Sequence, residues 1–247
     1  MSTPFSLQGK TILVTGASSG IGRATAVLCA NMGASVWLTG RDPARLQATL
    51  DNLPGIGHGL HLADLTNGSA RNALVDSLPA LDGCVFCAGA VELVPARMVS
   101  EKHLNDMMQI NFTVPVLLTQ RLLSRKLICD GASLVYVTAV AERIAPVATS
   151  MYSAAKAALT AYVRTLALEH AKRRIRANCV SPGYVATPML TALASNTNMQ
   201  DKLDLTPLGT IEPSDIANGI GYLLAPASRW VTRSSLLIDG GLSLPMR

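Results

Sequence analysis

Short apolar, often β-branched runs alternate with helical patterns along this 247-residue chain, and that alternation constrains the fold more than any other feature. The predicted strands are residues 11–15, 35–39, 59–62, 83–86, 132–138, 175–180 and 235–238. The predicted helices are residues 21–32, 43–53, 68–78, 100–111, 114–129, 150–171 and 213–224. Strands separated by helices form a parallel sheet with helices on both faces. The sequence therefore predicts one α/β domain over residues 1–247, a Rossmann-type doubly wound parallel sheet.

The composition supports a large buried core. Apolar residues make up 49% of the chain and charged residues only 15%, which excludes a disordered protein. The net charge of +5 invites a nucleic-acid interpretation, but the one basic cluster, residues 172–176, has no stacking aromatics around it. We interpret this cluster as a solvated helix end and expect no nucleic-acid partner.

Targeting and cysteine patterns indicate a cytoplasmic protein. Five cysteines are scattered without the spacing of a disulfide framework or a metal site, so we expect a reducing compartment and no metal. The first ten residues lack the apolar core of a secretion signal, and no apolar run is long enough to span a membrane. We therefore expect no membrane partner.

A glycine-rich turn joins the first strand to the first helix. Glycines at this place permit a tight turn and close approach of a pyrophosphate, which the positive end of the helix binds. The phosphate-binding candidates in this turn are Gly16, Ser18, Ser19, Gly20, Ile21 and Gly22. The turn therefore predicts a dinucleotide site within the first βαβ unit.

The end of the second strand indicates which dinucleotide binds. An acidic residue there would favour NAD by bonding the ribose 2′-hydroxyl, but the chain has Gly40 and Arg41. A guanidinium suits a phosphate, so we predict NADP(H) as the cofactor. Asp42 precedes Pro43 and is expected to cap a helix instead. Asp64 and Leu65, after the third strand, fit the edge of an adenine pocket.

A candidate acid/base pair lies on the long alanine-rich helix. Tyr152 and Lys156 are four residues apart and so face the same way. A tyrosine ionises near pH 10, and we expect the lysine ammonium to lower the pKa of Tyr152. The pair can then move a proton to or from a substrate oxygen while a nicotinamide moves hydride.

These motifs, in this order, resemble the short-chain dehydrogenases/reductases over essentially the whole chain. The resemblance rests on the glycine turn, Asn111, the Tyr152 and Lys156 pair, the loop from Ser181 to Pro188, and the Asp239-Gly240-Gly241 signature. It implies a carbonyl reductase or the reverse alcohol dehydrogenase, with Asn111 in a proton relay to Lys156. The family includes reductases for acyl chains on carrier proteins, sugars, steroids and polyketides.

The resemblance also extends the predicted cofactor site. The further cofactor-binding candidates are Cys87, Ala88, Gly89, Tyr152, Lys156, Pro182, Gly183, Val185 and Thr187.

The segment from Met189 to Pro207 is expected to cover the substrate as a lid. A stripe of small residues on the long helix implies a homodimer or homotetramer, since that helix packs against its copy in the family; burial against the chain's own sheet is the alternative.

Two positions depart from the family pattern. Ala139 stands where the family usually has a serine that bonds the substrate oxygen, and its methyl group cannot donate a hydrogen bond. Thr138 is a candidate substitute if the strand end bends, because neighbours on a strand point to opposite faces. Cys87 replaces an asparagine that is mainly architectural in the family, and we interpret it as packing.

Two functional hypotheses follow. The first is an enzyme in which Tyr152 is the acid/base, supported by Lys156, Asn111 and Thr138, acting on a small or medium carbonyl or alcohol substrate. The second is an NADP(H)-binding sensor or scaffold of weak or no turnover, motivated by Ala139, since losing one donor to an oxyanion costs about a hundredfold or more in rate. Three retained catalytic groups favour the first.

Overall fold

A seven-stranded, all-parallel sheet organises the protein. The computed structural model describes residues 3–194 and 206–243. The strands are β1 (Thr11–Thr15), β2 (Ser35–Gly40), β3 (Gly59–Leu62), β4 (Leu81–Phe86), β5 (Ile128–Val137), β6 (Arg176–Pro182) and β7 (Ser235–Ile238). Their order in the sheet is β3-β2-β1-β4-β5-β6-β7. The order reverses between β1 and β4, which is where doubly wound sheets bind ligands.

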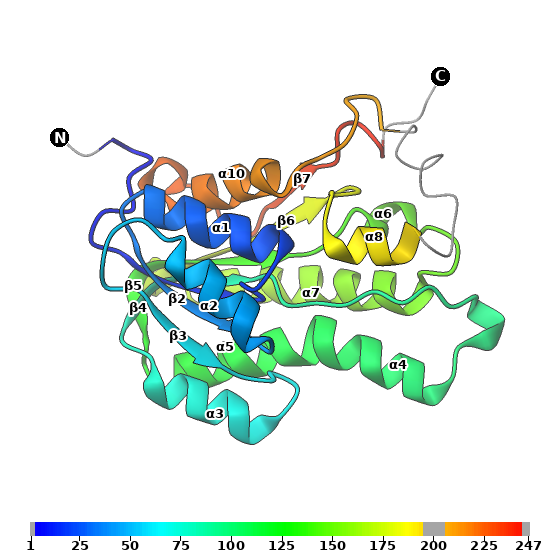
Figure 1. Cartoon of the computed structure of the whole chain (residues 1–247), viewed down its shortest axis with the longest axis horizontal. Helices are drawn as coiled ribbons and strands as arrows, with labels where there is room; N and C mark the ends of the chain where they lie inside the picture. Colours follow the sequence, from blue (N-terminus) through cyan, green and yellow to red (C-terminus); the bar gives the residue numbers. More distant parts are fainter. Residues whose placement is uncertain (1–2, 195–205, 244–247) are drawn as a thin grey trace.

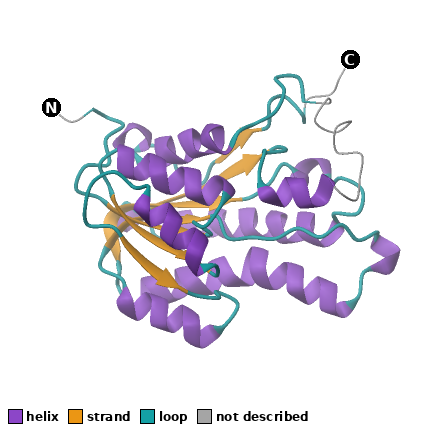
Figure 2. Cartoon of the chain, in the orientation of Figure 1, coloured by secondary structure: helices purple, strands orange, loops and turns teal. Residues whose placement is uncertain are grey.

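Helices cover both faces of the sheet (Figures 1 and 2). They are α1 (Gly20–Asn31), α2 (Pro43–Asp51), α3 (Gly68–Ser77), α4 (Glu101–Met108), α5 (Val114–Ser124), α6 (Ala141–Ile144), α7 (Ser150–Glu169), α8 (Pro188–Ala194) and α10 (Pro213–Leu224). One core lies between the sheet and α1, α2 and α10, where Val14, Val36 and Ile216 are buried. The other lies under α3, α5 and α7. The predicted doubly wound fold is therefore confirmed.

The region before β5 differs from the prediction. Helix α5 ends at Ser124 rather than near Cys129, because Lys126 adopts a positive φ of 56° and turns the chain. Strand β5 then begins at Ile128, four residues earlier than predicted. An irregularity in its pairing with β4 absorbs the extra residues: Ile128 pairs with Leu81 and Ser133 with Gly83. A turn-like Asp-Gly pair inside a bulged strand conceals its start in the sequence.

The basic cluster is only partly a solvated helix end, so that interpretation was wrong for two residues. Arg173 donates to Asp130 and to the Ile128 carbonyl. Arg176 lies in β6, is 8% exposed, and donates to the side chain of Ser228 and the carbonyls of Leu223 and Val231. Both arginines hold neighbouring segments together, and the strand pairing that requires this is not visible in local sequence.

The small-residue stripe on α7 is divided between burial and exposure. Ala155 and Leu166 are buried within the chain's own fold, whereas Ala158 and Tyr162 remain partly exposed. The expected substrate lid begins with α8, but its residues 195–205 lie outside the described part of the chain. No helix of the described residues is both long and apolar enough to cross a bilayer.

Candidate active site

Two adjoining cavities lie at the carboxyl ends of the strands. One, of about 250 Å³, follows the glycine turn and the ends of β2 and β3. The other, of about 170 Å³, lies between the ends of β4, β5 and β6, α7 and α8. Ile21, Cys87, Gly89, Thr187 and Met189 line both, so the two form one continuous site. Every cofactor-binding and catalytic residue predicted from the sequence lines one cavity or both.

The glycine turn shapes the first cavity. Gly16 has φ of 65°, a conformation that favours glycine, and a Cβ on Gly22 would lie 2.2 Å from the Gly16 carbonyl oxygen. The N-cap of α1, Ser19, makes no capping bond with its side chain, and the first turn of α1 carries no acidic residue. By contrast, side chains cap α2, α3 and α4. The N–H groups that begin α1 are therefore left for an anionic ligand.

The far end of this cavity is lined by two arginines, of which only Arg45 has an acidic partner. Asp42 caps α2 as predicted, accepting from the backbone and side chain of Arg45, whose Nε lies 2.6 Å from the carboxylate. Arg41 is exposed and, among the described residues, makes no hydrogen bond or ion pair. Hydrogen bonds from the Thr66 backbone and hydroxyl lower the pKa of Asp64; burial opposes them, and the nearby Arg41 charge lowers the pKa further. Arg41 is therefore the guanidinium open to a ligand.

Tyr152 and Lys156 lie on the face of α7 that lines the second cavity. Lys156 is 5% exposed, and its Nζ donates to the Val137 carbonyl at 2.9 Å. Burial lowers the pKa of Lys156 to about 8. Burial, reinforced by the Glu142 carboxylate, raises the pKa of Tyr152 well above 10. The expectation that Lys156 lowers the tyrosine pKa is therefore corrected: desolvation dominates, and Nζ is directed at Val137.

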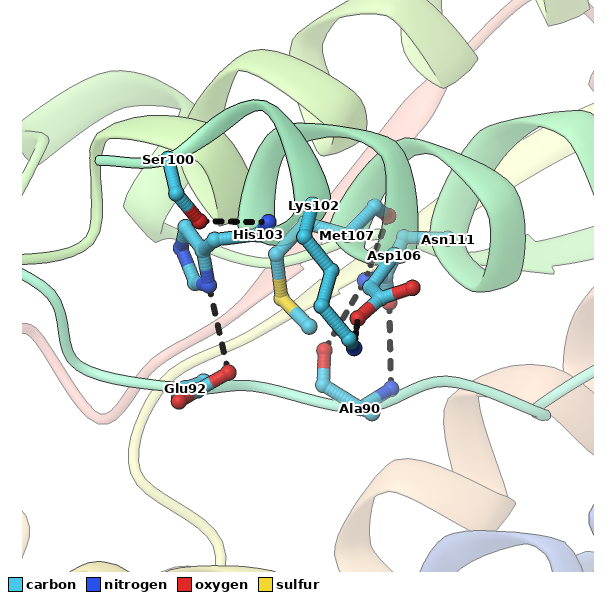
Figure 3. Close-up of polar contacts among 8 residues, drawn as sticks. All are labelled: Ala90, Glu92, Ser100, Lys102, His103, Asp106, Met107 and Asn111. Atoms are coloured by element: carbon cyan, nitrogen blue, oxygen red, sulfur yellow. Dashed lines mark hydrogen bonds and ion pairs between the residues drawn. The ribbon is translucent and has the colours of Figure 1, made fainter.

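Asn111 lies in a π-helical turn, Gln109–Thr113, that joins α4 to α5. Its side chain bonds both backbone groups of Ala90, accepting from the N–H at 3.2 Å and donating to the carbonyl at 2.9 Å. It also donates to Met107 (Figure 3). A Cβ on Gly89 would lie 2.9 Å from Asn111 Oδ1 and 3.5 Å from Lys156 Nζ. Asn111 and Lys156 thus flank the same glycine, and π-turns of this kind are frequent at functional sites.

Beside Asn111, the loop after β4 has a second tie to α4. The ring Nδ1 of His103 lies 3.1 Å from Glu92 Oε2, and Ser100 caps the helix by accepting from the His103 backbone (Figure 3). Glu92 therefore points toward α4, while its neighbours Val91 and Leu93 line the cavity. The two ties hold this wall of the cavity in place.

Strand β5 stops at Val137, and both Thr138 and Ala139 line the cavity. The N–H groups of Thr138 and Val140 donate to Val180 and Pro182, so this stretch stays bonded to β6 and no bend turns Thr138 toward the substrate. The Thr138 hydroxyl donates to the Val180 carbonyl at 3.2 Å. The Thr138 hydroxyl proton is therefore already used in a hydrogen bond to β6. Ala139 contributes only a methyl group to the cavity wall.

Several lining residues have no signal in the sequence. Pro146 and Thr149 come from the loop before α7, in which Ala145 and Ala148 adopt positive φ angles of 41° and 66°. The Ala148 carbonyl accepts from Val94, which joins this loop to the loop after β4. Only the tertiary structure brings these loops to the cavity. In the described chain, no three His, Cys, Asp or Glu side chains are grouped so as to hold a metal ion.

The chain is similar to known oxidoreductases over nearly its whole length. The family described as enoyl-(acyl carrier protein) reductase matches residues 16–243. The 3-oxoacyl-[acyl-carrier-protein] reductase of Chlamydia pneumoniae is 29% identical, over 97% of this chain and 99% of that protein. Glucose 1-dehydrogenase of Gluconobacter oxydans is 32% identical, over 96% and 92%. The solved angucycline C-6 ketoreductase LanV with bound NADP superposes with a TM-score of 0.90 at 27% identity, covering 97% of this chain and 98% of the other.

Proposed function

The chain belongs to the short-chain dehydrogenase/reductase family of oxidoreductases, and on that premise we propose that it is an NADP(H)-dependent reductase of a carbonyl substrate, or the reverse alcohol dehydrogenase. The observation that carries the proposal is the continuity of the two cavities, with Tyr152 and Lys156 in one and the uncapped start of α1 in the other.

The residues present fit a nicotinamide dinucleotide phosphate. The uncapped N–H groups of α1 suit the pyrophosphate, and Arg41 suits a phosphate on the adenosine ribose. Asp64 and Leu65 would border the adenine, and the residues from Pro182 to Thr187 would border the nicotinamide. When bound, the cofactor supplies or accepts the hydride. The NADP in the LanV structure supports this choice over NAD.

Side chains of the protein supply the proton that the carbonyl oxygen takes up on reduction. The raised pKa of Tyr152 keeps its phenol protonated through the neutral range, so it is ready to donate a proton to a carbonyl oxygen. Lys156, held by Val137, has its Nζ 5.6 Å from the Tyr152 ring centroid, so its charge offsets only part of the cost that burial adds to the phenolate. Asn111 holds Ala90 and Gly89 beside the lysine. We therefore favour reduction as the direction these residues support best.

NADPH consumption at saturating cofactor, against ketones, diketones, oxoacyl thioesters and ketosugars, tests the proposal. We expect turnover of at least one class. Tyr152→Phe in the same assay should lower kcat about a hundred- to ten-thousandfold while leaving NADPH binding intact. Tight NADPH binding with no turnover across the panel would contradict the enzymatic proposal.

Cofactor choice is tested at Arg41. Arg41→Ala should weaken NADPH binding about tenfold to a hundredfold and leave NADH binding unchanged, because only the phosphate of NADPH gains from a charge-assisted bond. Arg45→Ala is the matched control, since that guanidinium is already held by Asp42. Equal losses for NADPH and NADH would refute the assignment of Arg41 to the phosphate.

The second candidate function is NADP(H) binding without useful turnover. It is favoured by Ala139 and by the commitment of the Thr138 hydroxyl to Val180, which together leave one donor fewer at the reacting end. Ala139→Ser separates the two. A gain of about a hundredfold in carbonyl reduction would support a weakened or retired site. No gain would mean that the site activates its substrate without this hydroxyl.

We also propose that the protein is a cytoplasmic homodimer or homotetramer. The partly exposed Ala158 and Tyr162 on α7 support an assembly through this helix. Light scattering coupled to size exclusion tests it: a monomer at micromolar concentration would contradict the proposal.

A further inference from the structure

The second cavity is poor in charge. Apolar side chains from four segments form most of its walls: the loop after β4, the end of β5, the loop before α7, and the loop after β6 with α8. The apolar members are Ile21, Ala90, Val91, Leu93, Val137, Ala139, Val140, Ala141, Pro146, Pro182, Val185, Met189, Leu190 and Leu193. Among the described lining residues, Lys156 alone bears a formal charge near neutral pH, and its Nζ is bonded to Val137. Among these described residues, a negatively charged group away from the reacting end would find no cation.

Most hydroxyl groups that line this cavity already make hydrogen bonds within the protein. Thr138 donates to Val180, and Thr149 donates to the Pro146 carbonyl at 2.6 Å and bonds the Ser153 hydroxyl at 2.9 Å. The Thr187 hydroxyl donates to the Val185 carbonyl. The Asn111 amide is bonded to Ala90 and Met107. Of the described lining residues, Tyr152 and Tyr184 retain phenol groups with no protein partner.

These commitments limit what the cavity can bind. A buried hydroxyl or carboxylate that exchanges water for an apolar wall loses free energy unless it gains a partner. A sugar would bring several hydroxyls to a cavity with two open phenols. A ketone needs only one bond, from Tyr152.

We infer that the substrate of this site is an uncharged ketone with an apolar body, rather than a sugar or a keto acid. The inference rests on the carbonyl-reducing function proposed above. Tyr152 would bond the carbonyl oxygen, and Tyr184 would accommodate at most one further polar atom of the substrate.

Matched cyclohexanones test the substrate class. With saturating NADPH, kcat/KM is measured for 4-methylcyclohexanone, methyl 4-oxocyclohexanecarboxylate, 4-oxocyclohexanecarboxylate and a ketosugar. The two neutral ketones should exceed the carboxylate and the sugar about tenfold to a hundredfold, because each of the latter buries unpaired polar groups. Equal or better turnover of the carboxylate or the sugar would overturn the inference while leaving the proposed reductase in place.

Binding separates failure of the inference from failure of the function. Equilibrium dialysis of the four compounds against the NADP⁺-loaded protein gives their affinities without turnover. Selective binding of the neutral ketones with no turnover supports the inference and contradicts the reductase. Binding without selectivity, or no binding of the neutral ketones at millimolar concentration, overturns the inference.

A cation introduced into the wall of the second cavity tests whether this cavity sets the preference for uncharged ketones. Leu93→Arg adds a cation to the lining on a half-buried loop position. It should raise kcat/KM, or affinity in dialysis, for 4-oxocyclohexanecarboxylate at least about tenfold relative to its methyl ester. Ile56→Arg is the matched control, because Ile56 is 90% exposed and lines neither cavity. An equal change in both variants would overturn the assignment to this cavity.

Discussion

At the scale of single residues, Glu142 is a charged residue near Tyr152 and Lys156 that belongs to none of the sequence motifs. Its side chain is 7% exposed, and it accepts a hydrogen bond from Thr160, one helical turn beyond Lys156 on α7. Burial raises the pKa of Glu142, while Thr160, Arg143, Arg164 and Lys156 oppose that rise. The carboxylate in turn raises the pKa of both Tyr152 and Lys156. Glu142 therefore favours the protonated form of both groups that the proposed reduction requires.

Glu142→Gln should move the alkaline limb of the reduction profile to lower pH. In the wild type, burial lowers the pKa of Lys156 to about 8, so we expect reduction to decline as pH rises through that value. Without the carboxylate, the pKa values of Lys156 and Tyr152 both fall, so the decline begins earlier. The measurement is kcat for ketone reduction from pH 6 to 10. Thr160→Val, which keeps the charge, is the control; an unmoved limb in Glu142→Gln would contradict this role.

At the scale of elements, the loop after β4 is held to α4 and the π-turn by two ties of different strength. Asn111 bonds both backbone groups of Ala90 from a buried position. Glu92, 64% exposed, pairs with His103. A buried amide that satisfies backbone groups stabilises more than a side-chain contact with one exposed partner. The wall of the cavity therefore depends mainly on Asn111.

Asn111→Ala should lower the free energy of unfolding by about 2–3 kcal/mol, because it leaves the Ala90 and Met107 groups without their partner. Glu92→Gln should cost less than about 1 kcal/mol. Urea denaturation at pH 7 measures both. If the Glu92 variant loses as much stability as the Asn111 variant, the ranking of the two ties is wrong.

At the scale of the whole molecule, Arg176 connects the carboxyl half of the chain to the sheet. From β6 it reaches the Leu223 carbonyl at the end of α10, and Ser228 and Val231 just beyond. Burial lowers the pKa of this guanidinium. No carboxylate pairs with it in the described structure; its partners are carbonyls and a hydroxyl. Arg176 therefore acts as a polar brace between α10 and β6.

Arg176→Met should destabilise the protein by about 2–4 kcal/mol. The methionine preserves much of the apolar volume, but the Leu223 and Val231 carbonyls lose a donor. Arg229→Met, on an exposed neighbouring residue, should change stability by less than about 0.5 kcal/mol. Both are compared by urea denaturation. A neutral or stabilising Arg176→Met would mean that removing the buried charge outweighs the lost bonds.

The order of elements was predictable because each depends on local signals. Gly33 ended α1, Asp42 and Asn67 capped their helices, and strand β3 was predicted with the observed bounds. Helix α5 and strand β5 were misjudged where a bulge separates Leu81 from Gly83 in the pairing of β4 with β5. A bulge is a property of two strands together, so one strand's residues do not reveal it.

The sequence by itself determined the parallel sheet, the order of the motifs and the motif residues that line the two cavities, since periodicity and turn residues act over short stretches. Only the tertiary structure decided the direction of the Tyr152 pKa shift, the commitment of the Thr138 hydroxyl to Val180, and the apolar wall that Pro146 and Leu93 complete. Burial and hydrogen bonding depend on neighbours far away in the chain, and folding alone brings those neighbours together.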